Sequence, residues 1–182
     1  MPRYIAFLRA INVGGHVVKM DHLRRFFEAM GFSDVETFIA SGNVVFRSAA
    51  KNGKALEGKI GTKLREALGY EVATFIRTDA ELAAIAKHQP FRQSQLDKAV
   101  TFCVAFLVEP LDKKAVQKLM VLRTEIDDFH VHGREIYWLS RNKQSESVIS
   151  NAVFEKTIGA PSTMRGVNTV RKMAAKYAAP SS

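Results

Sequence analysis

The spacing of apolar residues near the N-terminus predicts a strand that is covered on both faces. Residues 3–9 are apolar at each of positions 4–8, so that Ile5 and Phe7 point one way while their neighbours point the other. A strand with one face in water would alternate apolar and polar residues instead. We therefore expect this strand at the centre of a sheet that is buried on two sides.

The residues that follow switch between helical and extended patterns. Asp21 can cap a first helix and Gly31 can end it, while Gly69 can end a second helix with apolar residues four apart. The resulting order, β-α-β-β-α-β, is that of a ferredoxin-like fold. The expected elements are a helix over 20–30, strands over 35–40 and 44–47, a helix over 56–68 and a strand over 72–77.

The second part of the chain repeats this order. After a short helix capped by Thr78 or Asp79 and a polar junction over residues 89–98, a strand begins at residue 100 that is again apolar on both faces. A helix near residue 116, a hairpin over 128–139 and a helix over 148–158 follow. We expect no closing strand here, but a final helix with one apolar side: Val167, Val170, Met173, Ala174 and Tyr177.

These patterns predict an α+β protein built from two duplicated ferredoxin-like (βαββα) halves, residues 1–90 and 91–182. A single ferredoxin-like sheet has helices on one face only, yet both first strands are apolar on both faces. We therefore expect the two sheets to cover each other or to merge, so that the halves pack as one unit.

Composition places the chain among ordinary globular proteins. Of its 182 residues, 47% are hydrophobic and 25% are charged, and no apolar run approaches the length of a membrane span. The N-terminus does not have the pattern of a signal peptide, and Cys103 is the single cysteine. These features favour a cytoplasmic protein without membrane partners.

The net charge of +9 favours an anionic partner. The excess leans toward residues 141–182, where seven Lys and Arg residues stand against two Glu residues. Nucleic acid and small phosphate- or carboxylate-bearing molecules both fit this charge. Charge alone carries no sequence readout, so nucleic acid is the alternative and the small anionic ligand is our leading hypothesis.

Two sharp backbone bends define the expected site. One helix connects the first two strands, so both strands point the same way and the segments that follow them lie at the same end of the sheet. Small and hydrogen-bonding residues gather in these two segments, and their N–H groups suit a phosphate or carboxylate. The expected ligand-binding residues here are Arg9, Asn12, Gly14, Gly15, Ser41, Gly42 and Asn43. Each segment alone can also be read as a turn with no other role.

A second polar cluster precedes the last helix. Arg165, Asn168 and Thr169 lie where helix N–H groups attract anions, and we count them among the ligand-binding residues. Capping of the helix by Asn168 or Thr169 is the alternative explanation of the same residues.

Familiar catalytic and metal-binding motifs are absent from the sequence, so it identifies no reaction and no cofactor. If catalysis occurs, His16 is our candidate acid or base, because it adjoins the glycines. Cys103 sits within an apolar strand and is expected to be a buried thiol. His130 and His132 share one strand face, but without a third ligand we expect a solvated face and no metal site.

Several segments resemble a known bacterial family. Residues 3–15 (RYIAFLRAINVGG), 41–46 (SGNVVF) and 168–170 (NTV) are similar to the family catalogued as domain of unknown function 1697. The resemblance implies two ferredoxin-like halves and transfers no activity. The family often has Ser-Lys where this chain has Ser147-Val148, and a Trp where this chain has Val167. A structural or interaction protein without a ligand stays a third alternative.

Overall fold

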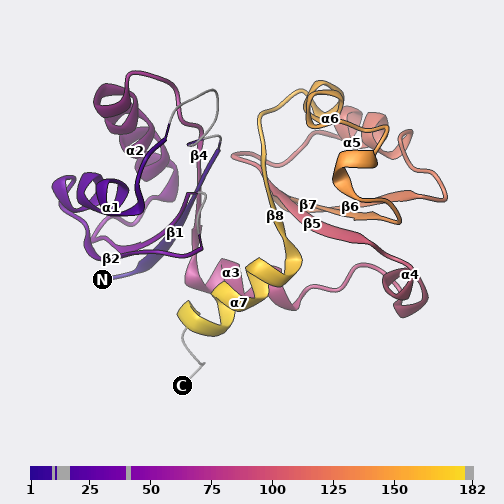
Figure 1. The fold of residues 1–182 in the computed structure, drawn as a ribbon, viewed down its shortest axis with the longest axis horizontal. Coiled ribbons are helices and arrows are strands. Elements are labelled where there is room, and N and C mark those ends of the chain that lie inside the picture. Colours follow the sequence, from indigo (N-terminus) through magenta and orange to yellow (C-terminus); the bar gives the residue numbers. More distant parts are fainter. Residues whose placement is uncertain (10, 12–16, 40–41, 179–182) are drawn as a thin grey trace. The chain divides into compact units, whose positions relative to one another are not determined.

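The computed structural model describes residues 1–9, 11, 17–39 and 42–178, and its helices and strands follow the predicted order (Figure 1). The chain divides into two compact units. The first unit runs from Met1 to Ala84 and also takes up the chain from Met173 onward, and the second runs from Ile85 to Lys172. The elements of the first part are β1 (Arg3–Leu8), α1 (Met20–Ala29), β2 (Ser33–Thr37), β3 (Asn43–Arg47), α2 (Gly53–Leu68), β4 (Thr74–Thr78) and α3 (Asp79–Lys87).

The second part repeats the arrangement. Its elements are α4 (Gln93–Asp97), β5 (Thr101–Phe106), α5 (Lys113–Met120), β6 (Asp127–His132), β7 (Glu135–Ser140), the short 3-10 helix η1 (Gln144–Glu146), α6 (Asn151–Ile158), β8 (Thr163–Gly166) and α7 (Val167–Tyr177). Both sheets are antiparallel, with strand orders β2-β3-β1-β4 and β6-β7-β5-β8. The α+β duplicated fold is thus confirmed. The alternative in which the two sheets merge is wrong, since each has its own four strands.

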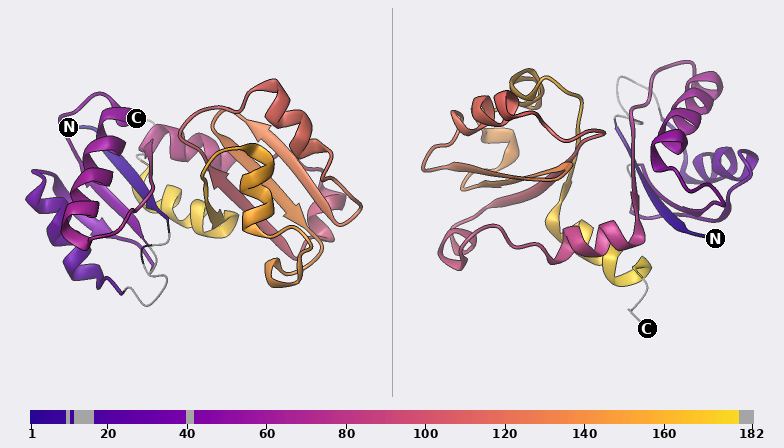
Figure 2. Two further views of the ribbon diagram at one scale, coloured as in Figure 1. Left: turned by 90° about the horizontal axis from the view of Figure 1, so that it is seen from above. Right: turned by 180° about the vertical axis from the view of Figure 1, so that it is seen from behind.

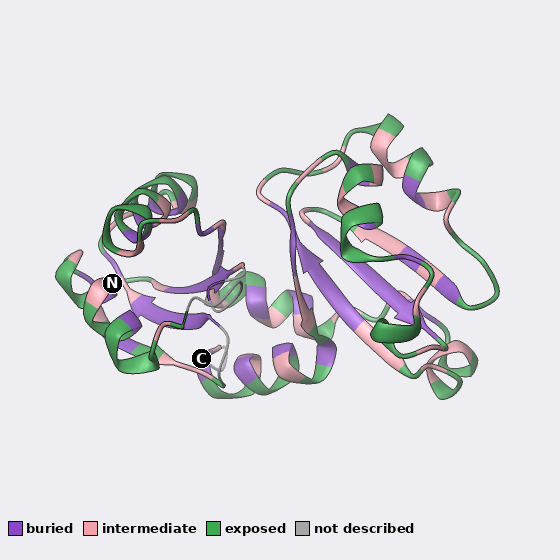
Figure 3. Cartoon of the chain, turned by 45° about the horizontal axis from the view of Figure 1, so that its top comes forward, coloured by how far each residue is buried: buried purple, intermediate pink, exposed green. Residues whose placement is uncertain are grey.

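Both faces of the central strand β1 are buried, as its sequence predicts. Tyr4, Ala6 and Leu8 join a cluster with residues of α1 and α2, which lie together on one face of this sheet (Figures 1 and 2). Ile5 and Phe7 point to the other face and have no exposed surface. Figure 3 shows the same pattern in each unit, with buried strands and helices whose outer sides are exposed.

The second sheet has the same two-sided strand at its centre. Cys103 and Ala105 of β5 belong to a core cluster with Leu119 of α5 and Phe154 of α6. Val104 points the opposite way and is 1% exposed. Period-2 alternation within one strand therefore supplies two separate buried faces.

Most helix ends match the local signals in the sequence. Gly69 ends α2 with a φ of 81°, and Gly159 ends α6 with a φ of 69°, both left-handed conformations that glycine adopts without strain. Thr78 begins α3 through a capping box: its Oγ1 accepts from Glu81 N at 3.1 Å, and Glu81 Oε2 accepts from Thr78 N at 2.8 Å. The predicted cap by Asp21 is wrong, because α1 begins at Met20 with Lys19 at the cap position, which places Asp21 in the first turn.

Three elements differ from the expectation. A closing strand does exist in the second half, since β8 pairs with β5 from Cys103↔Gly166 to Phe106↔Thr163. Its polar sequence resembled a helix cap, and only pairing with a central strand makes it extended. The predicted junction over 89–98 contains the short helix α4. Strand β2 ends at Thr37, before Phe38 and Ile39, so the following turn is longer than three residues.

No helix of the described part of the chain has the length and apolar character needed to cross a bilayer.

Candidate ligand-binding site

The two predicted backbone bends of the first unit do approach each other at their described ends. Leu8 N, at the end of β1, donates to Gly42 O at 2.8 Å. Gly42 has a φ of 80°, and a Cβ at this position would lie 2.9 Å from Leu8 Cβ. Asn12, Gly14, Gly15, His16 and Ser41 lie outside the described residues, so their part in a site stays a prediction.

Two described residues at this end already have structural roles. Asn43 is 2% exposed and begins β3, and its Nδ2 donates to Phe38 O at 3.1 Å. The carbonyl of Asn43 also accepts from Phe38 N at 3.0 Å, which closes the turn. Arg9 is half-buried, and its backbone N donates to Ala73 O at 2.9 Å. Asn43 therefore shapes the bend.

The second predicted cluster is divided between a strand and a helix. Arg165 lies in β8, where its Nη1 donates to Thr163 Oγ1 at 2.7 Å and to Met164 O at 2.9 Å. Burial lowers the pKa of the Arg165 guanidinium to about 10, which leaves it charged at neutral pH. Asn168 and Thr169 instead form the first turn of α7.

A pocket of about 560 Å³ opens at the start of α7, within the second unit. Asn168 and Arg171 line it together, because residues three apart share one face of a helix. Arg165 and Thr169 are not among its described lining residues. The wall consists of Gln89, Gln93, Leu96, Ala99, Val100, Thr101, Phe102, Gly166, Val167, Asn168 and Arg171.

The electrostatic character of this pocket follows from its lining. Arg171 supplies a positive charge, and no described lining residue carries a negative one. In the described part of the chain, Arg171 has no carboxylate partner. The first N–H groups of any α-helix lack carbonyl partners within the helix and carry partial positive charge. Arg171, the Asn168 amide and the first turn of α7 therefore all favour an anion.

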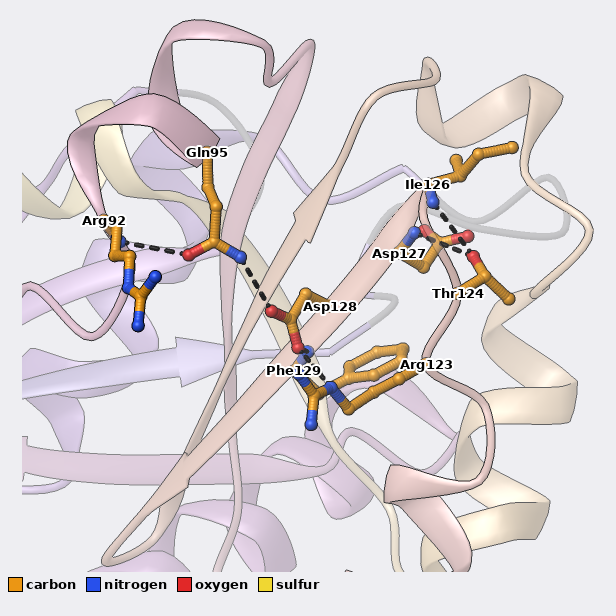
Figure 4. Close-up of polar contacts among 8 residues, drawn as sticks. All are labelled: Arg92, Gln95, Arg123, Thr124, Ile126, Asp127, Asp128 and Phe129. Atoms are coloured by element: carbon orange, nitrogen blue, oxygen red, sulfur yellow. Dashed lines mark hydrogen bonds and ion pairs between the residues drawn. The ribbon is translucent and has the colours of Figure 1, made fainter.

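The rest of the lining mixes polar and apolar side chains and is held in place by polar contacts. Leu96 of α4 belongs to this part of the lining, and α4 is tied to β6 by Gln95, whose Nε2 donates to Asp128 Oδ2 at 3.0 Å (Figure 4). The same Gln95 accepts from Arg92 N at 3.1 Å, and Asp128 also pairs with Arg123 at 2.6 Å. The lining thus combines polar groups with an apolar surface at Leu96, Ala99, Val100 and Phe102.

Thr101 and Gln93 have described partners at the pocket. Thr101 Oγ1 donates to Asn142 O at 2.9 Å, so this hydroxyl can only accept a further hydrogen bond. Gln93 Nε2 donates to Asp97 Oδ1 at 2.8 Å. The Gln93 amide has a second N–H, so donors for an anion can come from α7, Gln89 and Gln93.

Sequence reasoning found Asn168 but missed most of this lining. The sequence predicts residues 89–98 only as a polar junction, and Arg171 is not among the predicted site residues. The signal that could have found Arg171 is its position one helical turn after Asn168, on the same face. The contribution of Gln89 depends on tertiary placement and leaves no local pattern.

Comparison with known proteins places the chain in a family. A family profile described as "Protein of unknown function (DUF1697)" matches residues 1–137, which is most of the sequence. The chain belongs to this family. The matched residues of this DUF1697 protein include all of β1 to β6, whereas Asn168 and Arg171 lie beyond them.

A solved structure with the same fold is known from a bacterium. It is the conserved bacterial protein SP0830 from Streptococcus pneumoniae, which is 22% identical, has a TM-score of 0.75, and is matched over 97% of this chain and 98% of its own. At this identity the likeness shows the fold alone. The search of curated proteins found no match.

Proposed function

We propose that this DUF1697 protein binds a small anionic ligand, bearing a phosphate or a carboxylate, in the pocket at the start of α7. One observation carries the proposal. Arg171 and Asn168 both line the pocket near the start of an eleven-residue helix, and no described lining residue is a carboxylate. Cationic side chains and unpaired N–H groups at a helix start bind anions together.

The bends at residues 9–16 and 41–43 are a second position for the same chemistry. Gly42 brings the backbone against Leu8, and Arg9 follows directly. Asn12, Gly14, Gly15 and Ser41 would add hydrogen-bond donors from the two bends. Binding at these two bends is therefore a second proposal, and the experiment below distinguishes it from binding in the α7 pocket.

Single-stranded nucleic acid is less well supported. A ferredoxin-like sheet that stacks bases needs exposed aromatic rings on its face. Here Phe7, Phe75 and Phe106 have no exposed surface, and the large exposed hydrophobic residues of the described chain are aliphatic or Met.

The test is a binding titration with inorganic phosphate and simple carboxylates, in which binding is measured by calorimetry or by thermal shift. We expect saturable binding that weakens by about 10- to 100-fold in Arg171→Ala, the range for losing a charge-assisted hydrogen bond. Lys172→Ala is the matched control, because it removes the same charge from the neighbouring exposed residue of α7, which is not among the described lining residues.

The pattern of variants separates the two positions. Loss of binding in Asn12→Ala with Arg171→Ala unaffected would move the site to the bends of the first unit. Equal weakening in Arg171→Ala and Lys172→Ala would mean nonspecific attraction to a basic surface, and no saturable binding at all would favour a structural or interaction protein.

A further inference from the structure

Three histidines converge on one face of the second sheet. Each can offer a ring nitrogen so that the three ligand atoms lie within 4.8 Å of one another: His88, His130 and His132, the three-histidine cluster. The His88 ring stacks on the His132 ring with centroids 4.3 Å apart, and it lies 5.3 Å from the His130 ring. Two of these histidines were considered from the sequence, and the structure supplies the third.

The fold brings the cluster together from separate elements of one unit. Alternation along β6 places His130 and His132 on the same face, while Phe129 between Asp128 and His130 points to the core cluster on the helix side. His88 directly follows α3, and its ring meets those of His130 and His132 on this face. Tyr137 OH fixes the end of α3 by donating to Ile85 O at 3.1 Å, and the Tyr137 ring lies 5.1 Å from His88.

His88 contains an unsatisfied nitrogen. Its Nε2 is buried and has no hydrogen-bond partner among the described residues. A buried polar atom without a partner is costly, and native proteins rarely retain one without a reason. A cation bound by the three-histidine cluster would give a partner to His88 Nε2 or to ring nitrogens of the other two histidines.

Each histidine of the cluster can bind a metal ion through a ring nitrogen of its neutral imidazole. Carboxylates are also near: Asp128 precedes His130 on the same strand face, and Glu135 pairs with His132 across the hairpin.

We propose that His88, His130 and His132 bind one divalent late transition-metal ion, for which Zn²⁺ is the test probe. Imidazole nitrogens suit Zn²⁺, Cu²⁺, Ni²⁺ and Co²⁺, and calcium or magnesium prefer oxygen ligands. Zn²⁺ holds histidine nitrogens at about 2.0–2.1 Å in a tetrahedral arrangement. In such a tetrahedron the nitrogens are about 3.4 Å apart. Binding therefore requires ligand atoms that now lie within 4.8 Å of one another to move closer.

Three protein ligands leave one position of a tetrahedral ion open. Sites of this composition hold water or an external ligand in the fourth position, whereas closed structural sites use four protein ligands. The site is independent of the α7 pocket, because the two have no described residue in common.

The experiment uses the full-length chain without a histidine tag, first stripped of metal with a chelator. Titration with Zn²⁺ by calorimetry is expected to show one ion bound per chain, and Co²⁺ is expected to give the visible absorption of a tetrahedral nitrogen site. His132→Gln removes an exposed ligand and should weaken Zn²⁺ binding by more than about 100-fold, since even partners outside the ligand shell cost 10- to 100-fold.

His22→Gln is the matched control, because His22 is exposed on α1 and lies outside the cluster. It should leave Zn²⁺ affinity unchanged, and circular dichroism of the metal-free variants should match the parent protein. Absence of stoichiometric Zn²⁺ binding would overturn the proposal. Zn²⁺ affinity that is unchanged in His132→Gln, or that falls equally in His22→Gln, would also overturn it. Either result would mean that the three rings only stack against Tyr137.

Discussion

Arg77 and Arg165 occupy equivalent positions in the two halves of the chain. Arg77 of β4 lies opposite Ile5 of the central strand β1, and Arg165 of β8 lies opposite Val104 of the central strand β5. In both, guanidinium Nη1 donates to the carbonyl of the preceding residue, at 2.8 and 2.9 Å. The duplication therefore extends to single side-chain contacts.

The buried guanidinium of Arg77 predicts a large stability effect. Arg77 has no exposed surface, so Arg77→Ala leaves a cavity and removes charge-assisted hydrogen bonds. We expect a loss of about 2–4 kcal/mol in the free energy of unfolding, measured by urea denaturation. Arg65→Ala is the control: Arg65 is 68% exposed in its ion pair with Glu71, and its removal should cost less than about 1 kcal/mol. Similar losses in both variants would contradict the burial of Arg77.

Gly42 is required by two separate constraints. Its φ of 80° disfavours any other residue, and a Cβ would lie 2.9 Å from Leu8 Cβ and 3.0 Å from Leu8 O. Gly69 has nearly the same φ, 81°, with no atom within 4 Å of such a Cβ. Gly69→Ala should therefore cost about 1–2 kcal/mol for the left-handed conformation alone, and Gly42→Ala should cost more. Thermal or urea unfolding of the two variants measures the difference. Equal losses in the free energy of unfolding would mean that the chain at Leu8 moves away easily to admit a Cβ at residue 42.

Glu57 accepts a hydrogen bond from the backbone of an edge strand of the first sheet. β4 is an edge of that sheet, and Ile76 N donates to Glu57 Oε1 at 2.9 Å rather than to another strand. Glu57 is 8% exposed on α2, so Glu57→Ala leaves a buried N–H without this acceptor. We expect a loss of about 1.5–3 kcal/mol. Glu66→Ala, on the exposed side of the same helix, should change stability by less than about 0.5 kcal/mol; a Glu57→Ala variant as stable as Glu66→Ala would refute this role.

Cys103 should be chemically inert in the folded protein. Burial raises the pKa of its thiol to about 12, so the reactive thiolate is scarce at pH 8. We expect alkylation of the native protein to be at least about 100-fold slower than in urea, and to accelerate as the pH rises toward 12. Reaction at the same rate in native and unfolded protein would place the thiol at the surface.

Local patterns specify much of this fold. Central strands apolar on both faces, glycines after α2 and α6, and the apolar stripe of α7 all follow from neighbouring residues, and the structure confirms them. β8 could not be found this way, because Thr163–Gly166 is polar and becomes a strand only by pairing with β5.

The candidate sites depend still more on tertiary placement. His88 and the hairpin that carries His130 are far apart in the sequence, and nothing local connects them. Gln89 and Arg171 likewise meet only through the fold. Asn168, by contrast, follows from a polar residue at a predicted helix start.

If the two halves pack as one unit, as we expect from the sequence, residues 1–90 should not fold stably alone. That segment lacks Tyr177, whose carbonyl accepts from Arg3 Nη1 at 2.6 Å and whose hydroxyl donates to Glu36 Oε2 at 2.8 Å. We expect residues 1–90 to be insoluble or to unfold at a lower temperature than the full chain, as measured by calorimetry. A stable, soluble, monomeric fragment with the melting temperature of the full chain would contradict this expectation.

Chemical-shift mapping by NMR during a titration with inorganic phosphate tests the proposed ligand site most directly. We expect saturable shifts of the backbone amides of Val167, Asn168 and Thr169 and of the Arg171 side chain, with Lys172→Ala behaving like the parent protein. Shifts confined to the bends at residues 9–16 and 41–43, or an absence of saturable shifts, would contradict a ligand pocket at the start of α7.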